Sequence, residues 1–92
     1  MYVSELIGRE FHGFESEALG NVKDIVVMDD GWVIEKLEIK IPRHICIKYG
    51  IARFTSKTVA IPMEFVIQKD GQLMSIYATE ELFRMLHLVE SK

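Results

Sequence analysis

Residues 20–41 read GNVKDIVVMDDGWVIEKLEIKI, and this stretch decides the fold. Two segments rich in Ile and Val meet at Asp30-Gly31, a dipeptide that supplies the positive φ angles of a tight hairpin turn. Toward the end of the second segment, residues 32–41, apolar and charged residues alternate, so a slip of one residue would expose its apolar side. The side predicted to face the core consists of Leu37, Ile39 and Ile41. Pro42 is expected to end this strand.

The first segment of this hairpin, Val22 to Asp29, has apolar residues on both of its alternating sides. One side holds Val22, Val26 and Met28, and the other holds Ile25 and Val27. Apolar residues on both sides are typical of a central strand covered on both faces. We therefore expect this strand to lie inside the sheet, with other parts of the protein packed on each face.

Further extended segments flank the hairpin. Strands are expected at residues 9–14, 45–47, 57–61, 65–68 and 73–77, with 45–47 as a short edge strand followed by a loop around residues 50–56. Eleven Ile and eight Val residues favour strands, because β-branched side chains fit a pleated sheet. The last two strands flank Asp70-Gly71, which predicts a second hairpin.

The end of the chain has a helical pattern. Thr79 suits an N-cap, and Glu80 and Glu81 suit the positive end of a helix dipole. One helical face is formed by Leu82, Met85, Leu86 and Val89. The sequence therefore predicts a helix from Glu80 to about Val89.

These segments predict a mainly β fold, a small barrel of about six mostly antiparallel strands with a C-terminal helix. The length of 92 residues suits a single domain over residues 1–92, with the barrel at about 3–77 and the helix at about 79–89. A domain of this size buries a modest share of its surface, so dimerisation is an expected way to bury more.

The composition excludes several classes of protein. The net charge of −3, from 11 basic and 14 acidic residues, is too balanced for nucleic acid or an anionic membrane as the main partner. Cys46 is the only cysteine, which excludes an internal disulfide and favours a reducing compartment. The first residues lack the cationic start of a signal peptide, and no apolar run approaches the ~20 residues of a membrane span. We therefore expect a cytoplasmic protein without a membrane span.

Three short motifs follow one another along the chain. They are Gly8 in ELIGREF, Gly20-x-Val22-x-Asp24 in LGNVKDIVV, and Ile61-Pro62-x-Glu64 in VAIPMEFVIQKDGQLMSI. Their order and spacing resemble the PRC-barrel family over about residues 3–77, leaving out the C-terminal helix. The same fold occurs in the photosynthetic reaction centre H subunit, in the C-terminal domain of the ribosome maturation factor and in small stand-alone archaeal proteins.

This resemblance implies assembly work: docking onto a membrane-complex subunit, a ribosomal protein or, for some archaeal members, the cell-division apparatus. Physical chemistry supports the motif positions independently. Gly20 allows an approach that a Cβ would resist, and Asp24 within an apolar run needs backbone amides or a cation as partners. Pro62 suits a strand end because it cannot donate to a ladder.

No catalytic set is recognisable, so we expect no enzyme activity, metal or cofactor. The soft metal ligands are His12, His44, His87 and Cys46. They lack zinc-site spacing, although His44 and Cys46 would share one face of a strand. The nucleophile candidates lack an identifiable base. Asp24 is interpreted as a structural hydrogen-bond acceptor, and Asp29-Asp30 as turn residues, rather than as general bases.

Residues 43–57 carry a concentration of positive charge. Arg43, Lys48, Arg53 and Lys57 occur there without an acidic residue, with Tyr49 and Phe54 between them. Basic side chains bind phosphates and aromatic rings stack on bases, which makes this segment a candidate RNA-binding site. The alternative is a solvated loop with two aromatic rings tucked inward.

Trp32 and Ile34 share an alternating side with the charged residues of their strand and are expected on its outer face. An exposed Trp beside an Ile is typical of an interface, and cover by the terminal helix is the alternative. The predicted interface anchors are Trp32, Ile34, Phe83 and Leu88. The sequence thus favours a non-enzymatic protein–protein adaptor that forms a homodimer and binds an unidentified protein. The other hypothesis is an RNA- or ribosome-associated accessory factor that uses residues 43–57.

Overall fold

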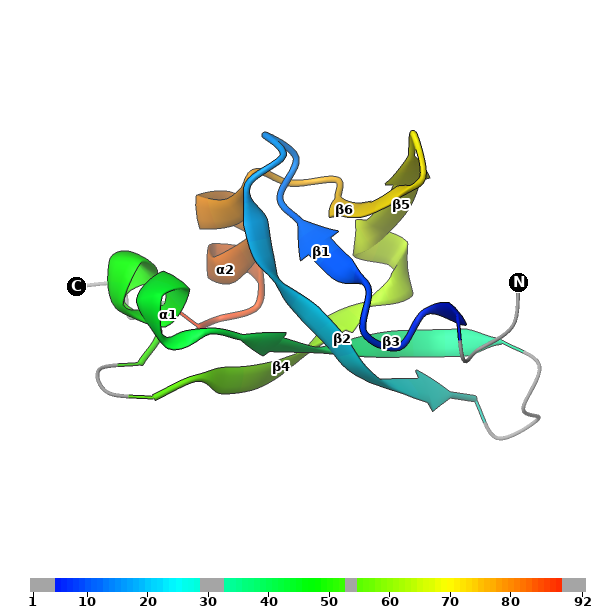
Figure 1. Cartoon of the computed structure of the whole chain (residues 1–92), viewed down its shortest axis with the longest axis horizontal. Helices are drawn as coiled ribbons and strands as arrows, with labels where there is room; N and C mark the ends of the chain where they lie inside the picture. The colour runs from blue at the N-terminus through cyan, green and yellow to red at the C-terminus, as the bar shows by residue number, and fades with distance from the viewer. Residues whose placement is uncertain (1–4, 29–32, 53–54, 89–92) are drawn as a thin grey trace.

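The computed structural model describes residues 5–28, 33–52 and 55–88 (Figure 1). Within these residues six strands form one sheet: β1 (Glu10–His12), β2 (Ala18–Val27), β3 (Ile34–Ile41), β4 (Lys57–Pro62), β5 (Val66–Lys69) and β6 (Gln72–Ser75). Helix α1 (Arg43–Tyr49) lies between β3 and β4, and a 3-10 helix, η2 (Met63–Phe65), lies between β4 and β5. Helix α2 (Thr79–Met85) follows β6.

The strands are ordered β4-β3-β2-β1-β6-β5 in the sheet. Neighbouring strands are antiparallel except for β1 and β6, which are parallel. The sheet curls into a half-barrel whose two edges are β4 and β5. Figure 1 shows the long β2 crossing the middle of the molecule, with α1 and α2 on the same side of it. The structure confirms the predicted mainly β, mostly antiparallel fold with a C-terminal helix.

One hydrophobic core joins the sheet to both helices. Phe11 of β1, Leu37 and Ile39 of β3, and Leu82 and Phe83 of α2 are fully buried in it. Burial of a large apolar side chain contributes about 1.5–3 kcal/mol, so this cluster is the main source of stability. The predicted core side of β3 is confirmed.

A β-bulge explains the apolar residues on both sides of β2. Val22 and Asp24 lie opposite consecutive residues of β3, so Lys23 is an extra residue in β2. The extra residue reverses the alternation, and both Val22 and Ile25 contact the core. Near the end of the strand Val27 is exposed. The strand lies inside the sheet as predicted, but the expected cover on both faces is wrong.

A second bulge changes the side on which Ile34 lies. Val26 and Val27 lie opposite Lys36 and Ile34, respectively, so Glu35 is the extra residue in β3. Ile34 returns to the core side and packs against the hydrophobic cluster. The predicted outer position of Ile34 is therefore wrong, because alternation does not continue through a bulge.

The segment predicted as an edge strand at residues 45–47 is helix α1 instead. Ile45 and Cys46 are buried and Tyr49 is half-buried, which is the spacing of one helical face. Gly50 adopts a φ of 71°, and its N–H and that of the next residue bond to carbonyl groups of the last turn. This Schellman motif closes the helix. An alternation of only three residues is compatible with a helix as well as a strand, so it does not specify a strand.

Helix α2 confirms the predicted C-terminal helix, although it ends at Met85 rather than near Val89, which lies outside the described residues. His87 adopts a φ of 57°, and the N–H of Leu88 donates to the carbonyl oxygen of Phe83 at 3.0 Å. This hydrogen bond is the outer bond of a second Schellman motif. The first helical residue is Thr79, so its predicted role as the N-cap is wrong by one position.

Candidate interaction surfaces

The four predicted interface anchors do not form one exposed surface. Trp32 lies outside the described residues. Phe83 is fully buried, and its ring packs edge-to-face on Tyr49 with the ring centroids 5.3 Å apart. Ile34 and Leu88 are half-buried and pack against the core. The predicted interface role of Phe83 is wrong, because α2 turns this side chain into the core of the half-barrel.

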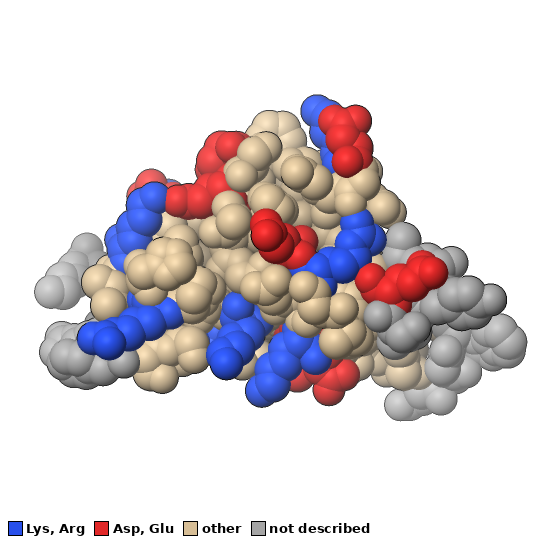
Figure 2. All heavy atoms as spheres, in the orientation of Figure 1, with Lys and Arg blue, Asp and Glu red and all other residues tan. Residues whose placement is uncertain are grey.

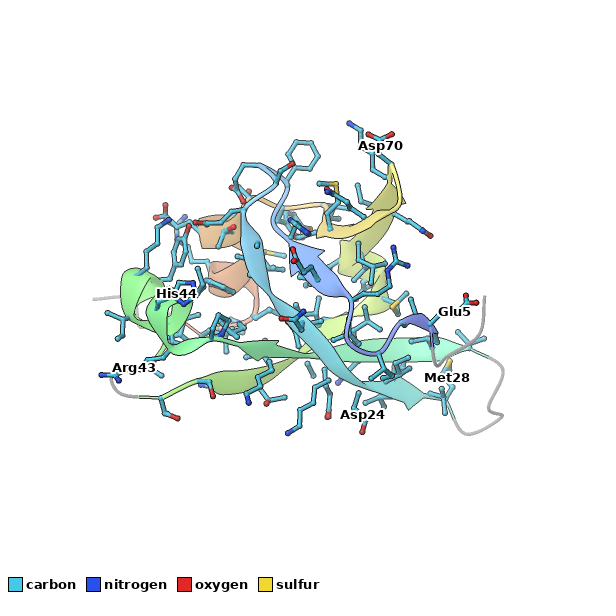
Figure 3. The ribbon with its side chains drawn as sticks, in the orientation of Figure 1. Glu5, Asp24, Met28, Arg43, His44 and Asp70 are labelled. Carbon is cyan, nitrogen blue, oxygen red and sulfur yellow. The ribbon has the colours of Figure 1, made fainter. Side chains whose placement is uncertain are left out.

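A different set of apolar side chains is exposed at the end of the β2–β3 hairpin. Val27, Met28 and Val33 keep 45%, 48% and 51% of their surface accessible. Met28 and Val33 are neighbours, because the N–H of Met28 donates to the carbonyl oxygen of Val33 at 2.9 Å. Figure 3 shows Met28 near Glu5 at one end of the molecule and Arg43 at the other. We call Val27, Met28 and Val33 the apolar tip.

Sequence reasoning misses the apolar tip for a specific reason. Val27 and Met28 continue an apolar run, and such a run indicates a covered strand when each residue is assigned to one of two alternating faces. The available signal is their position directly before the Asp-Gly turn, where a hairpin projects beyond the strands that cover it. Ile7, in the turn before β1, is a further exposed apolar residue.

The described basic residues of segment 43–57 belong to two different elements of the structure. Arg43 begins α1 and Lys57 begins β4, and both are exposed. Lys48 is paired with Glu17 at 2.5 Å, and Arg53 lies outside the described residues. On the face shown in Figure 2, uncharged residues separate the basic side chains along the lower edge, and acidic side chains lie beside them at one end. The described residues therefore do not form one continuous basic strip.

Glu17, in the loop directly before β2, contacts α1. Its carboxylate accepts hydrogen bonds from the ammonium group of Lys48 and from the hydroxyl of Tyr49. The bond from Lys48, followed by that from Tyr49, holds the pKa of the Glu17 carboxyl below its ordinary value. The same contact raises the pKa of Lys48, and burial followed by the bond to Glu17 raises the pKa of Tyr49. These contacts engage two of the residues considered for RNA binding, and they fix the loop before β2 against the helix.

The residues of the first two family motifs shape the backbone around β2. The N–H of Gly8 donates to the carbonyl oxygen of Val22 at 2.7 Å, which holds the N-terminal turn against β2. A Cβ at Gly20 would collide with the carbonyl oxygen of Lys40 on β3. Asp24 is exposed and its carboxylate accepts the N–H of Ile25 at 2.8 Å, which is the behaviour of a structural acceptor. These residues therefore have local structural contacts.

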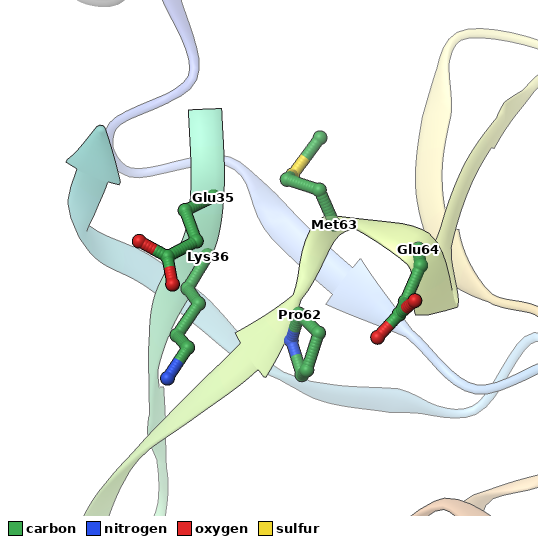
Figure 4. Close-up of a pocket in the computed structure, with 5 residues that line it drawn as sticks. All are labelled: Glu35, Lys36, Pro62, Met63 and Glu64. Atoms are coloured by element: carbon green, nitrogen blue, oxygen red, sulfur yellow. The ribbon is translucent and has the colours of Figure 1, made fainter. Parts of the chain in front are cut away.

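The third motif borders a pocket of about 320 Å³ where β4 ends beside β3 (Figure 4). The pocket is lined by Glu35, Lys36, Pro62, Met63 and Glu64. Glu35 and Lys36 come from the bulge in β3, whereas Pro62 ends β4 and Glu64 lies in η2. Its lining combines two carboxylates and one ammonium group with the apolar side chains of Pro62 and Met63.

The histidines and the cysteine are not brought together as a metal site. Across residues 5–28, 33–52 and 55–88, no three His, Cys, Asp or Glu side chains lie close enough to hold a metal ion. His44 is exposed on α1, whereas Cys46 is buried and burial raises the pKa of its thiol. Their predicted common strand face is wrong because the segment is helical. In the same part of the chain, no helix has the length and apolar character needed to cross a bilayer.

No curated protein matches this chain. The family model of the PRC-barrel domain matches residues 1–81, which include all six strands and the three motifs. The curled six-stranded sheet agrees with this match. The chain therefore belongs to the PRC-barrel domain family.

Proposed function

We propose that this protein is a non-enzymatic adaptor that forms a homodimer and holds a partner protein in a larger assembly. Its family indicates a small β-barrel module for protein interaction. The observation that carries the proposal is the apolar tip, whose three large side chains each have about half of their surface accessible. Met28 and Val33 lie across the hairpin from each other, and neighbouring exposed apolar side chains are typical of protein contacts.

The tip is well placed for a tight contact. Val27 belongs to β2, and Met28 and Val33 are joined across the hairpin by a backbone hydrogen bond. Side chains on hydrogen-bonded strands lose less freedom on binding than side chains on loose loops. Burial of their accessible apolar surface against a partner then contributes at about 25 cal/mol per Å².

Affinity capture from a lysate of the native cells, followed by mass spectrometry, tests the role of the tip. The tagged wild-type chain is compared with Val33→Asp, which places a charge in the tip. Ile47→Asp is the matched control, because Ile47 on α1 has the same accessible fraction as Val33, 51%, and lies outside the tip. We expect Val33→Asp to lose a protein that the wild type and Ile47→Asp both retain. Identical captures by all three chains would contradict the proposal.

The RNA-binding alternative through residues 43–57 has less support, because Lys48 is engaged by Glu17 and Tyr49 packs on Phe83. A salt titration separates the two functions. Binding to phosphates weakens steeply as the ionic strength rises, whereas apolar association does not. A gel-shift assay with cellular RNA at low salt is expected to show no complex.

The setting of this function is part of the proposal. Its single cysteine favours a reducing compartment, and we propose that the adaptor works in the cytoplasm. The resemblance to stand-alone archaeal members supports cell division as the assembly, and the resemblance to the ribosome maturation factor supports ribosome assembly. The identity of the protein lost by Val33→Asp distinguishes these settings.

A further inference from the structure

The outer edge of β4 carries hydrogen-bonding groups that the sheet does not use. β4 stands at the end of the strand order and pairs with β3. Pro62 pairs with Lys36 in this ladder but has no N–H, so that pair is of the kind that exchanges no hydrogen bonds. The two kinds of pair alternate along an antiparallel ladder, so Thr58 and Ala60 are of the same kind as Pro62. Their N–H and C=O groups therefore point away from β3.

These groups face open space in the described part of the protein. Among residues 5–28, 33–52 and 55–88, no backbone hydrogen bond outside the β3 ladder involves Thr58 or Ala60. Both residues are exposed. A row of free N–H and C=O groups on an edge strand is a template for another strand.

The centre of β4 lacks the features that usually protect an edge. Natural edge strands are shielded by charged side chains, prolines or bulges. In β4 the charge and the proline lie only at the ends, at Lys57 and Pro62, and the ladder with β3 has no register shift. The opposite edge, β5, has four residues and ends in the charged Lys69. β4 is therefore the edge better suited to pairing.

We propose that β4 pairs antiparallel with the β4 of a second copy of this chain, around a twofold axis at Val59. In this register Thr58 lies opposite Ala60 of the second copy, and Ala60 lies opposite its Thr58. Each of these pairs exchanges both of its N–H···O bonds, so the outward groups of both residues are used. No like charges face each other across the centre, because the residues from Thr58 to Ile61 are uncharged.

The same geometry fixes the number of copies. Pairing of β4 with β4 uses one surface twice and closes at two chains, whereas pairing of β4 with the β5 of another copy would leave free edges and extend into a filament. This inference rests on the homodimer of the proposed function and names its surface, a continuous sheet across two half-barrels.

Sedimentation equilibrium over a wide range of concentrations tests the pairing. Ala60→Pro removes an outward N–H from each copy and keeps the ladder with β3, which does not use that N–H. Ala60→Ser is the matched control, since it changes the side chain and keeps the N–H. We expect a wild-type dimer, a dissociation constant raised by about tenfold or more in Ala60→Pro, and a change of less than about threefold in Ala60→Ser.

The possible results distinguish a failure of the β4 pairing from a failure of the homodimer itself. A wild-type chain that stays monomeric at every concentration overturns both the pairing and the homodimer. A dimer that Ala60→Pro leaves intact, or growth beyond two copies, overturns the pairing alone, and neither result affects binding through the apolar tip. If Ala60→Pro does not fold, amide hydrogen exchange of the wild type decides: slower exchange at Thr58 and Ala60 above the dimer dissociation constant supports the pairing, and unchanged exchange overturns it.

Discussion

Gly20 lies at a close approach of β2 to β3. A Cβ there would lie well inside the van der Waals distance of the Lys40 carbonyl oxygen and would also press on the side chain of Ile39. The obstructing atom belongs to the backbone of a paired strand, so it cannot move aside without disturbing the ladder. The first glycine of the Gly-x-Val-x-Asp motif is thus required for a close approach of two strands.

Replacement of Gly20 by Ala is expected to lower the free energy of unfolding by about 1–3 kcal/mol, as overpacking does in other proteins. Urea titration of the two proteins measures the difference. Lys23→Ala, an exposed change in the same strand, is the control and is expected to shift the free energy by less than about 0.5 kcal/mol. Equal stabilities of Gly20→Ala and the wild type would contradict the close approach.

The hydrogen bonds to Glu17 make the free energy of unfolding depend on pH. The hydrogen bonds from Lys48 and then Tyr49 lower the pKa of its carboxyl in the folded state below the ordinary value of 4.5. The stability from this carboxylate is therefore fully present above the pKa of the unfolded chain and is lost as the pH falls through the lower, folded-state pKa.

We therefore expect the stability difference between the wild type and Glu17→Gln to be larger near pH 7 than near pH 3. Denaturant titration of both proteins at each pH measures that difference. A gap of the same size at both pH values would show that the carboxylate charge has no part in fixing the loop to α1.

At the scale of elements, α2 is capped by a residue from the other end of the chain. The carboxylate of Glu15 accepts the N–H of Thr79 at 3.1 Å and its hydroxyl at 2.5 Å. Thr79 is buried, and the N-cap residue Ala78 offers no side-chain hydrogen bond. Glu15 thus satisfies a free N–H at the start of the helix and ties the β1–β2 loop to it.

Glu15→Ala is expected to reduce the free energy of unfolding by about 1 kcal/mol, the usual contribution of a capping side chain. The change also leaves the buried Thr79 hydroxyl without its acceptor. Thermal unfolding followed by circular dichroism measures the loss, with Glu5→Ala at an exposed acidic residue as the control. Identical melting of both variants would mean that the contact does not stabilise α2.

The end of α2 offers a stabilising substitution. His87 occupies the left-handed region just after the helix, where glycine is normally favoured. His87→Gly is expected to raise the free energy of unfolding by about 0.5–1 kcal/mol, because it removes strain that exceeds the entropy a glycine adds to the unfolded chain. His44→Gly makes the same change within α1 and is expected to lower it by a similar amount. Changes of the same sign in thermal unfolding would contradict this account.

Alternation in the sequence predicts the strands of this fold only where it extends over several residues. The alternation from Leu37 to Ile41 places β3 correctly, and Asp70-Gly71 forms the predicted turn with positive φ at both residues. The three-residue alternation at 45–47 fails, because the decisive signal is Pro42 before the segment and Gly50 after it, a proline–glycine frame typical of a helix.

The bulges in β2 and β3 reverse the alternation without a mark in the sequence, so the sides of Ile25 and Ile34 could not be predicted. The candidate site is less predictable still. Phe83 is apolar on an amphipathic helix, and only tertiary packing decides whether it faces the core or a partner. Exposure of the apolar tip depends in the same way on which elements cover the end of the hairpin.

At the scale of the whole molecule, the half-barrel keeps the two proposed contact surfaces apart. Thr58 and Ala60 lie opposite Lys40 and Glu38 of β3, whereas Val33 precedes that strand. The bulge at Glu35 adds a residue with little added length, so about four steps of 3.4 Å from Glu38 back to Val33 separate the free edge from the tip by roughly 14 Å. A dimer joined through β4 therefore leaves both tips accessible, and we expect the two contacts to be lost independently.

Native mass spectrometry of complexes captured from native lysate tests whether the two contacts are independent, with tagged wild type, Ala60→Pro and Val33→Asp compared side by side. We expect a wild-type dimer with a bound partner, an Ala60→Pro monomer with the same partner, and a Val33→Asp dimer without it. A wild-type chain recovered alone, or a single substitution that removes both the second copy and the partner, would contradict this expectation.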